Sequence, residues 1–368
     1  MNGSSAADSS DPSVWISVDA MGGEGGATAI IGGMAMSAAK NPEIGFILHG
    51  DENVFGPLLQ KKPELSARTR LKAVTKVISM DEKPARALRQ GKGTSMWNAL
   101  ESVEQGEATV AVSCGNTGAL MALSMLRLRR APGVDRPAIA VLWPSRNPSG
   151  YNVVLDVGAD IRADASDLLK FAIMGATYAR HGLELKRPRV GLLNVGTEEH
   201  KGRSELHDAA RMIEEASVTG DFEYIGFVEG SDISSAGVDL VVTDGFAGNI
   251  ALKTAEGTAS LVRELLGNAF NHSPFSKLGA LFALTSLRRL QKRIDPRRVN
   301  GGVFLGLNGT VIKSHGSADA TGVSAAIKLA FKLAKNGFSD RVAARLASDI
   351  ATGHSGPEEK EPPEANRA

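Results

Sequence analysis

The stretch VGLLNVGTEEHKG at residues 190–202 decides the fold that this sequence predicts. Its run of apolar β-formers indicates a buried strand, which ends in a small polar turn and leads toward a helix start. Because α/β proteins bind ligands at the carboxyl ends of such strands, we expect Asn194 and Thr197 to line a binding site. Lys201, a little further along, adds a point charge suited to phosphate.

The same alternation of strand and helix continues along most of the chain. Helix-period segments separate most of the β-rich runs, which predicts an α/β fold with a mostly parallel sheet and helices on both faces. The predicted strands cover residues 15–18, 44–48, 72–77, 109–112, 138–142, 152–156, 190–194, 222–227, 240–243 and 310–313. The predicted helices cover residues 27–39, 95–105, 117–129, 163–180, 203–216, 248–270, 319–335 and 339–350.

Composition limits the classes of function. With 368 residues and 42% hydrophobic content, the chain can bury a large core as one α/β domain or two smaller ones. We expect a single domain over residues 14–350, with polar tails at 1–13 and 351–368. The 42 basic residues nearly balance the 41 acidic residues, so nucleic acid is not expected as a partner.

Cysteine usage and hydropathy bear on location. Because Cys114 is the only cysteine, an internal disulfide framework is excluded, and the opening residues lack a signal-peptide pattern. Both observations favour the cytoplasm. No apolar run reaches the ~20 residues that a membrane-spanning helix needs, which leaves contact with a membrane surface open.

Glycines follow the first predicted strand in VDAMGGEGG, residues 18–26. Gly22 and Gly23 let backbone amides approach an anion, and the next helix offers a partly positive start, which favours a phosphate-like group. A flexible turn is the competing interpretation, because the spacing differs from the dinucleotide-binding motif. Asp19, at the end of the strand, has either a structural hydrogen-bonding role or a role in the site.

A second polar turn, SCGNTG, follows a β-rich run and opens an apolar helix. Asn116 and Thr117 are also suited to cap that helix, and a cap uses the same exposed N–H groups as an anion site. Nothing near Cys114 is suited to act as its base, so we do not expect a nucleophilic thiolate. The candidates for substrate binding in this turn are Ser113, Asn116, Thr117 and Gly118.

A third turn, VVTDGFAGN, places an acid, two glycines and an amide before another helix. Asp244 is suited to hold a lysine or a substrate N–H, and Asn249 to present its amide to a developing oxyanion. The alternative for Asn249 is a plain helix N-cap. Lys253, four residues later on the same helix face, favours a site.

A fourth turn of this kind is VIKSHGSAD. His315 within it is either a general acid or a histidine with structural hydrogen bonds. The stretch GKGTS at residues 91–95 is superficially similar to a nucleotide-binding loop but lacks the upstream glycine, so we expect a loop and a helix cap there. Neither ATP nor any metal or other cofactor is expected.

In their residues and in their order along the chain, these motifs resemble those of the phosphate acyltransferase of bacterial phospholipid synthesis, the PlsX family. The resemblance covers roughly residues 14 to 335. It rests on VDAMGG, SCGNTGALM, GVDRPA, LDVGA, AIMGATYA, VGLLNVGTE, VVTDGFAGN, LKTAEG and VIKSHGS. The family usually has aspartate after VDAMGG, where this chain has Glu24.

The resemblance implies a homodimeric enzyme with three α/β/α layers, similar in fold to phosphotransacetylases and isopropylmalate dehydrogenase-like enzymes. The implied reaction moves a long-chain acyl group from acyl carrier protein to inorganic phosphate, and the acyl phosphate then serves a glycerol-3-phosphate acyltransferase in the membrane. Phosphate is already nucleophilic and a thiolate leaves readily, so no covalent enzyme intermediate is needed. We expect Lys201 to orient phosphate and Asn249 to stabilise the oxyanion or bind phosphate.

A helical segment at about 262–298 is expected to protrude from the domain and to reach a membrane or a partner. Leu278, Leu281 and Phe282 form an apolar stripe, and Arg288 and Arg289 belong to a basic cluster that follows it. Anionic lipid at the inner face of the cell membrane, acidic acyl carrier protein, and ordinary dimer or core packing remain alternatives.

Three rival functions remain open. A short-chain phosphotransacetylase that uses coenzyme A would share the fold and the phosphate chemistry. A decarboxylating dehydrogenase would need metal-binding aspartates clustered at one turn, and the chain shows no such motif. A membrane-surface scaffold would have no use for four glycine-amide turns at strand ends.

Overall fold

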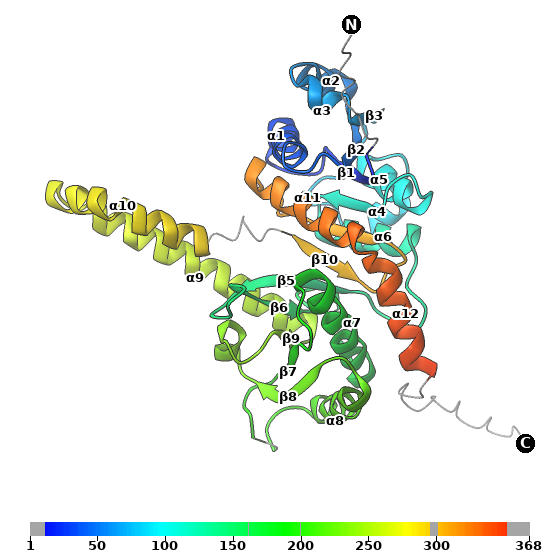
Figure 1. The fold of residues 1–368 in the computed structure, drawn as a ribbon, viewed down its shortest axis with the longest axis vertical. Coiled ribbons are helices and arrows are strands. Elements are labelled where there is room, and N and C mark those ends of the chain that lie inside the picture. The colour runs from blue at the N-terminus through cyan, green and yellow to red at the C-terminus, as the bar shows by residue number, and fades with distance from the viewer. Residues whose placement is uncertain (1–11, 161, 199, 295–300, 352–368) are drawn as a thin grey trace, which may run out of the picture.

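One sheet of eleven strands organises the protein, and helices cover both of its faces (Figure 1). The computed structural model describes residues 12–160, 162–198, 200–294 and 301–351, and the side chains of residues 288–294 and 348–351 lie outside this description. The strand order is β3-β2-β1-β4-β11-β10-β5-β6-β9-β7-β8. The predicted α/β class with a mostly parallel sheet is confirmed.

The strands match the predicted runs closely except at two places. They are β1 (Val14–Asp19), β2 (Ile44–Gly50), β3 (Thr69–Ala73), β4 (Val110–Ser113), β5 (Ala138–Pro144), β6 (Tyr151–Leu155), β7 (Arg189–Leu193), β8 (Glu223–Val228), β9 (Leu240–Val242), β10 (Gly302–Leu305) and β11 (Thr310–Lys313). The strand predicted at 72–77 is wrong by several residues, since pairing with β2 ends at Ala73. The short strand β10 was not predicted.

The helices add several short elements to those predicted from periodicity. They are α1 (Gly26–Ala38), α2 (Glu52–Gln60), α3 (Pro63–Ser66), α4 (Pro84–Gln90), α5 (Ser95–Glu104), α6 (Thr117–Arg127), α7 (Ala165–Leu183), α8 (Ser204–Thr219), α9 (Gly245–Asn271), α10 (Pro274–Ile294), α11 (Ala320–Lys335) and α12 (Phe338–Ala351), with a 3-10 turn at Gly230–Ser234. The elements missing from the prediction are α2, α3, α4 and this turn. All are too short to show a clear helical period.

The sheet consists of two parallel halves that run in opposite directions. β1, β2, β3, β4 and β11 are mutually parallel, and so are β6, β7, β8 and β9. Between the halves, β10 is antiparallel to β11 and β5, and β5 is antiparallel to β6. The polar turns after β1, β4 and β11 therefore leave one half, whereas those after β6, β7 and β9 leave the other.

Two hydrophobic clusters fill the space between the sheet and its helices. Ile16 and Val18 of β1 face the cluster that contains the buried sides of α1, α7, α8 and α11. Ala111 and Val311 face the second cluster, which contains α5 and α6 and carries the start of α9. Because alternate residues of a strand point to opposite faces, these clusters lie on opposite sides of the sheet. The central strands are accordingly apolar on both sides.

The helices α9 and α10 form a hairpin that extends away from the sheet (Figure 1). Within the described residues, no helix combines the length and the apolar character needed to cross a membrane. We propose that residues 14–350 form one domain, because a single sheet runs through them and this hairpin is its only long excursion in the described parts of the chain.

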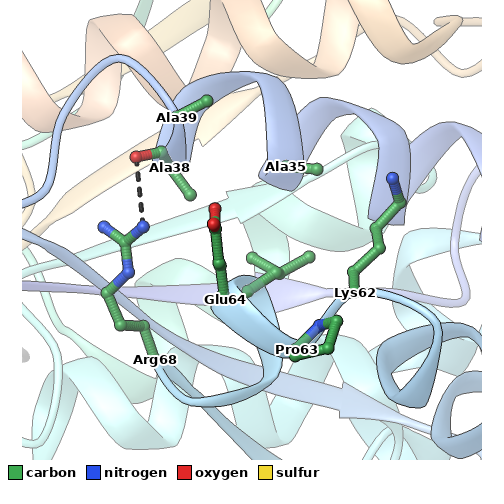
Figure 2. A pocket seen from close by; sticks show the side chains of 8 residues that line it. Ala35, Ala38, Ala39, Lys62, Pro63, Glu64 and Arg68 are labelled. Carbon is green, nitrogen blue, oxygen red and sulfur yellow. Dashed lines mark hydrogen bonds between the residues drawn. The ribbon is translucent and has the colours of Figure 1, made fainter.

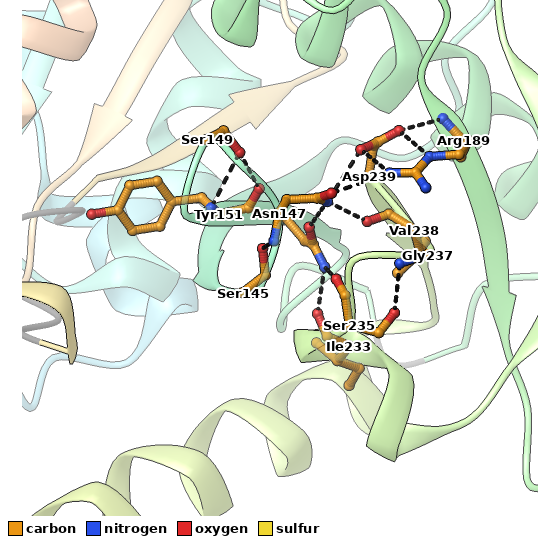
Figure 3. A network of polar contacts seen from close by, with 11 residues as sticks. Ser145, Asn147, Ser149, Tyr151, Arg189, Ile233, Ser235, Gly237, Val238 and Asp239 are labelled. Atoms are coloured by element: carbon orange, nitrogen blue, oxygen red, sulfur yellow. Dashed lines mark hydrogen bonds and ion pairs between the residues drawn. The ribbon is translucent and has the colours of Figure 1, made fainter.

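A buried polar network ties together the amino ends of the second half of the sheet (Figure 3). Arg189, at the start of β7, donates to both carboxylate oxygens of Asp239 at 2.9 Å. Asn147 donates to Asn152 and to the Val238 carbonyl oxygen at 2.5 and 2.8 Å. The network fastens the β5–β6 hairpin to β7 and β9, at the edge opposite the polar turns of this half.

A cavity of about 470 Å³ lies beside α1 and α3 (Figure 2). The Arg68 guanidinium lines it and donates to the carbonyl oxygens of Ala38 and Pro42, so it caps the end of α1. Since α1 ends where β2 is about to begin, the cavity lies at the amino edge of the strands. It is therefore separate from the turns that carry the predicted chemistry.

Candidate active site

The carboxyl ends of β1, β4 and β11 bring one group of predicted residues together. Asp19 pairs in register with Ser113, and Ser113 with Lys313, so all three side chains project from the same face. The Ser113 hydroxyl donates to the Asp19 carboxylate at 2.7 Å. Burial raises the pKa of Asp19, although the hydrogen bond from Ser113 acts in the opposite direction.

The glycines of these turns allow them to pack directly on one another. A Cβ on Gly22 would lie 2.7 Å from the Gly115 Cα, and one on Gly23 would lie 2.7 Å from the Cys114 Cβ. The Glu24 N–H also donates to the carbonyl oxygen of Gly316 at 2.8 Å. The first, second and fourth turns therefore form one interlocked surface, which explains why small residues occur in all three.

The second turn has a clear structural role. Asn116 caps α6 by accepting from the Ala119 N–H at 2.9 Å, and its amide donates to the carbonyl oxygens of Met80 and Glu82. Thr117 is exposed, and Gly118 packs closely against Pro84. The helix-cap interpretation of Asn116 is confirmed, and so is the cap predicted for GKGTS, where Thr94 accepts from the Trp97 N–H.

The turn after β7 positions Lys201 on the surface. Asn194 is buried, accepts from the Val195 N–H and donates to the carbonyl oxygen of Lys201 at 2.9 Å. The Lys201 ammonium lies 2.7 Å from the Glu198 carboxylate, and this hydrogen bond raises the pKa of Lys201. Thr197 is exposed in the same turn. Asn194 thus shapes the loop, and Lys201 is the charged group that the loop presents.

The start of α9 lies against this loop. Asp244 caps α9 by accepting from the Ala247 N–H at 2.8 Å, and its carboxylate forms an ion pair with Arg203 at 2.5 Å. Asp244 therefore binds a cation, as the sequence suggested, but the cation is arginine. Asp244 also occupies the cap position, so the alternative interpretation of Asn249 as the N-cap is wrong.

Asn249 is exposed and lies beside the loop that follows β6. A Cβ on Gly158 would lie 3.5 to 3.6 Å from the Asn249 side chain, and Gly158 has a φ of 127°, which favours glycine. The buried Asp156 carboxylate holds this loop by accepting from the N–H groups of Gly158, Ala159 and Asp160. The backbone loop after β6, which Asp156 holds in place, therefore packs against the Asn249 side chain.

Lys253, His315 and Lys313 complete the polar groups near these turns. Lys253 is exposed and pairs with Glu256 at 2.8 Å, and the exposed His315 ring contacts the Ser317 hydroxyl at 2.8 Å. Lys313, which closes the apolar strand β11, was not among the predicted site residues. Its position at a strand end, two residues before His315, was the feature of the sequence that could have marked it as a candidate.

The apolar residues predicted for membrane or carrier contact are largely exposed on α10. Leu278, Leu281 and Phe282 expose 51%, 60% and 83% of their surfaces. Their exposure excludes core packing within this chain. The side chains of Arg288 and Arg289 lie outside the described residues.

The fold is the one seen in phosphotransacetylases. One from Streptococcus pyogenes superposes with a TM-score of 0.58 at 16% identity, over 88% of this chain and 94% of that one. A 4-hydroxythreonine-4-phosphate dehydrogenase from Klebsiella pneumoniae gives 0.51 at 13% identity, over 87% and 99%. At these identities the likeness establishes the fold alone, which is the class expected from the sequence.

Sequence comparison establishes the family. The pattern of the family described as "Fatty acid synthesis protein" matches residues 14–341. The phosphate acyltransferase of Paracoccus denitrificans is 66% identical over 338 residues, which cover 92% of this chain and 91% of that protein. The chain therefore belongs to the phosphate acyltransferase family of fatty acid and phospholipid synthesis.

Proposed function

We propose that this phosphate acyltransferase transfers a long-chain acyl group from acyl carrier protein to inorganic phosphate. Family membership supports the reaction type, and the polar turns at the strand ends support an anion site. A phosphate oxygen would attack the thioester carbonyl carbon, and the resulting tetrahedral oxyanion would collapse with loss of the pantetheine thiolate. The products are an acyl phosphate and the free carrier.

We assign Lys201 and Asn249 the main roles in this reaction. The Arg203–Asp244 ion pair joins the Lys201 loop to the start of α9, which carries Asn249. Lys201 would leave Glu198 to hold the incoming phosphate, and Asn249 would donate to the oxyanion. Both side chains are exposed, so a substrate reaches them without unfolding the core.

The twist of the sheet supports a site shared by its two halves. Adjacent strands rotate by about 20 to 25°, so the seven steps from β1 to β7 accumulate about 150°. Because the second half runs in the opposite sense, this rotation brings the carboxyl ends of both halves to the same side, and burial together with the charge of Lys253 on α9 lowers the pKa of Lys313 at the end of β11. Asp19, Gly22, Gly23, Ser113 and His315 would then line the same pocket as Lys201 and Asn249.

The assay that tests the function follows release of free carrier thiol from palmitoyl carrier protein. We expect release to require phosphate and to yield an acyl phosphate that hydroxylamine traps as the hydroxamate. Acetyl-coenzyme A in place of the acyl carrier protein is the control donor. Equal or faster turnover with acetyl-coenzyme A would contradict the proposal and indicate a short-chain phosphotransacetylase.

We propose further that the protein is a homodimer in the cytoplasm and that α10 contacts the inner face of the membrane. Leu261 and Leu265 on α9 expose 55% and 57% of their surfaces, which suits packing against a second copy. The stripe of Leu278, Leu281 and Phe282 suits a lipid surface, close to a membrane acyltransferase that takes the product. Acyl carrier protein is the other candidate for this surface.

Replacing Leu278, Leu281 and Phe282 together by serine is expected to lower liposome binding at least about tenfold, because burial of each such side chain contributes about 1.5 to 3 kcal/mol. Sedimentation with anionic vesicles measures the binding, and light scattering checks that the variant stays dimeric. Val218, exposed by 80% on α8, provides a matched apolar control in Val218→Ser. Unchanged vesicle binding with a raised KM for acyl carrier protein would assign the stripe to the carrier instead.

A further inference from the structure

Five basic residues lie in the segment 76–92, which leads from β3 to α5 and contains α4. One face of α4 packs on α6, because Ala87 is buried and a Cβ on Gly91 would lie 3.2 Å from the Leu123 side chain (Figure 1). Arg86 and Arg89 lie three residues apart on the other face and are exposed. We call the α4 surface the side chains of Lys76, Lys83, Arg86, Arg89 and Lys92 together with Met80 and Leu88.

Most of this positive charge has no compensating acid. The segment holds five basic residues and two acids, which leaves an excess of three positive charges, although the whole chain carries a formal charge of only +1. One acid, Glu82, lies 3.6 Å from Arg86. Lys83, Arg89 and Lys92 make no ion pair within the part of the chain that the structure describes. The excess charge is therefore local, and it is exposed to solvent.

Hydrogen bonds hold the segment in place at both ends of α4. The Lys76 ammonium donates to the carbonyl oxygens of Gln90 and Lys92 at 2.7 and 3.2 Å. Before α4, the Asn116 amide donates to the carbonyl oxygen of Met80 at 2.6 Å. The cations are therefore carried by a backbone that is fastened to the second turn of the candidate site.

The α4 surface borders the turns of the candidate site. A Cβ on Gly316 would lie 2.7 Å from the terminal methyl of Met80, so the Met80 side chain lies against the fourth turn. That turn interlocks with the first through the Glu24 N–H. Met80 and Leu88 expose 36% and 42% of their surfaces, which places apolar area beside the cations. A partner bound here would hold a flexible arm at the edge of the site.

We propose that acyl carrier protein docks on the α4 surface. The proposal rests on the acyltransferase function above, which requires this donor to bind close to the polar turns. The carrier is acidic, so the excess positive charge attracts it and steers its approach, and Met80 and Leu88 add uncharged contacts. Anionic lipid has the same charge, but the larger exposed apolar side chains that suit a bilayer lie on α10, away from the sheet. We therefore assign α10 to lipid and α4 to the carrier.

Steady-state kinetics of the double variant Arg89→Glu/Lys92→Glu test the docking surface. We expect the KM for acyl carrier protein to rise about tenfold at low salt, because each reversal replaces an attraction by a repulsion. The KM for inorganic phosphate should stay the same, since neither side chain belongs to a turn of the candidate site. In the unchanged enzyme the KM for the carrier should rise with salt, and this dependence should be weaker in the variant.

The matched control is Lys186→Glu/Arg187→Glu, which reverses two exposed charges just before β7. These residues lie at the amino edge of their half of the sheet, away from the polar turns, so the KM for the carrier should be unchanged. Circular dichroism checks that each variant folds. If Arg89→Glu/Lys92→Glu does not fold, the neutral variant Arg89→Gln/Lys92→Gln carries the test, with a smaller expected rise in KM.

Calorimetric titration of the enzyme with holo carrier protein separates this inference from the proposed function, because it needs no acyl transfer. Weaker binding to the α4 variant than to the control supports the docking surface even if the acyl-transfer assay fails. Unchanged carrier binding and an unchanged KM in the folded α4 variant would overturn the proposal, whatever the acyl-transfer assay shows. Loss of binding to anionic vesicles without loss of carrier binding would also overturn it and assign α4 to lipid.

Discussion

Asn249→Ala is expected to lower kcat about 100- to 1000-fold while the protein remains folded. An amide that donates to a tetrahedral oxyanion contributes about 3 to 4 kcal/mol to the transition state and little to the bound substrate. KM should therefore change less than kcat. Asn249 is exposed and does not cap α9, so its truncation removes no buried contact of the helix.

The matched control is Asn268→Ala, the same change at an exposed position further along α9, where turnover should be unaffected. Lys201→Ala is the companion variant, and a loss of similar size is expected because phosphate loses its orienting cation. Near wild-type turnover in both Asn249→Ala and Lys201→Ala would rule out the assigned roles. Hydroxylamine trapping of the product measures all three variants.

Asp239→Ala is expected to cost about 1.5 to 3 kcal/mol of unfolding free energy, because it removes the carboxylate that accepts charge-assisted hydrogen bonds from the Arg189 guanidinium, which is itself 34% exposed. The Arg189 N–H also loses an acceptor at 2.9 Å. Urea unfolding, followed by circular dichroism, measures the change.

Asp221→Ala removes an exposed ion pair with Arg180 and serves as the comparison, with an expected loss of about 0 to 1 kcal/mol. Similar losses in the two variants would show that the network in Figure 3 does not brace the sheet.

Strong local signals account for the parts of the fold that the sequence predicted. β2 is buried at all seven positions, and long helices such as α7 show a clear helical period, so both were identified from composition and spacing. β10 has four residues and begins with glycine, which is too little pattern to distinguish from a loop. Its antiparallel placement between β11 and β5 depends on tertiary packing alone.

The candidate site also has parts that the sequence predicted and parts that it did not. Glycine turns after strands were visible in the sequence, and the structure shows why they are small, since Gly22 and Gly115 pack backbone to backbone. The ion pair of Arg203 with Asp244 joins residues 41 positions apart, which no local pattern reveals. Lys313 depends in the same way on its alignment with Ser113, which brings the ends of β4 and β11 together.

If Asn249 acts in the reaction as proposed, the length of α9 sets the distance between the reacting groups and any surface that α10 contacts. From Asn249 to Asn271 the helix rises about 33 Å, whereas one leaflet of a bilayer core is about 15 Å thick. If the hairpin stands upright on lipid, a fatty chain held by Asn249 does not reach the leaflet. The newly made anhydride must then detach and travel along the hairpin before its tail can dissolve in the bilayer.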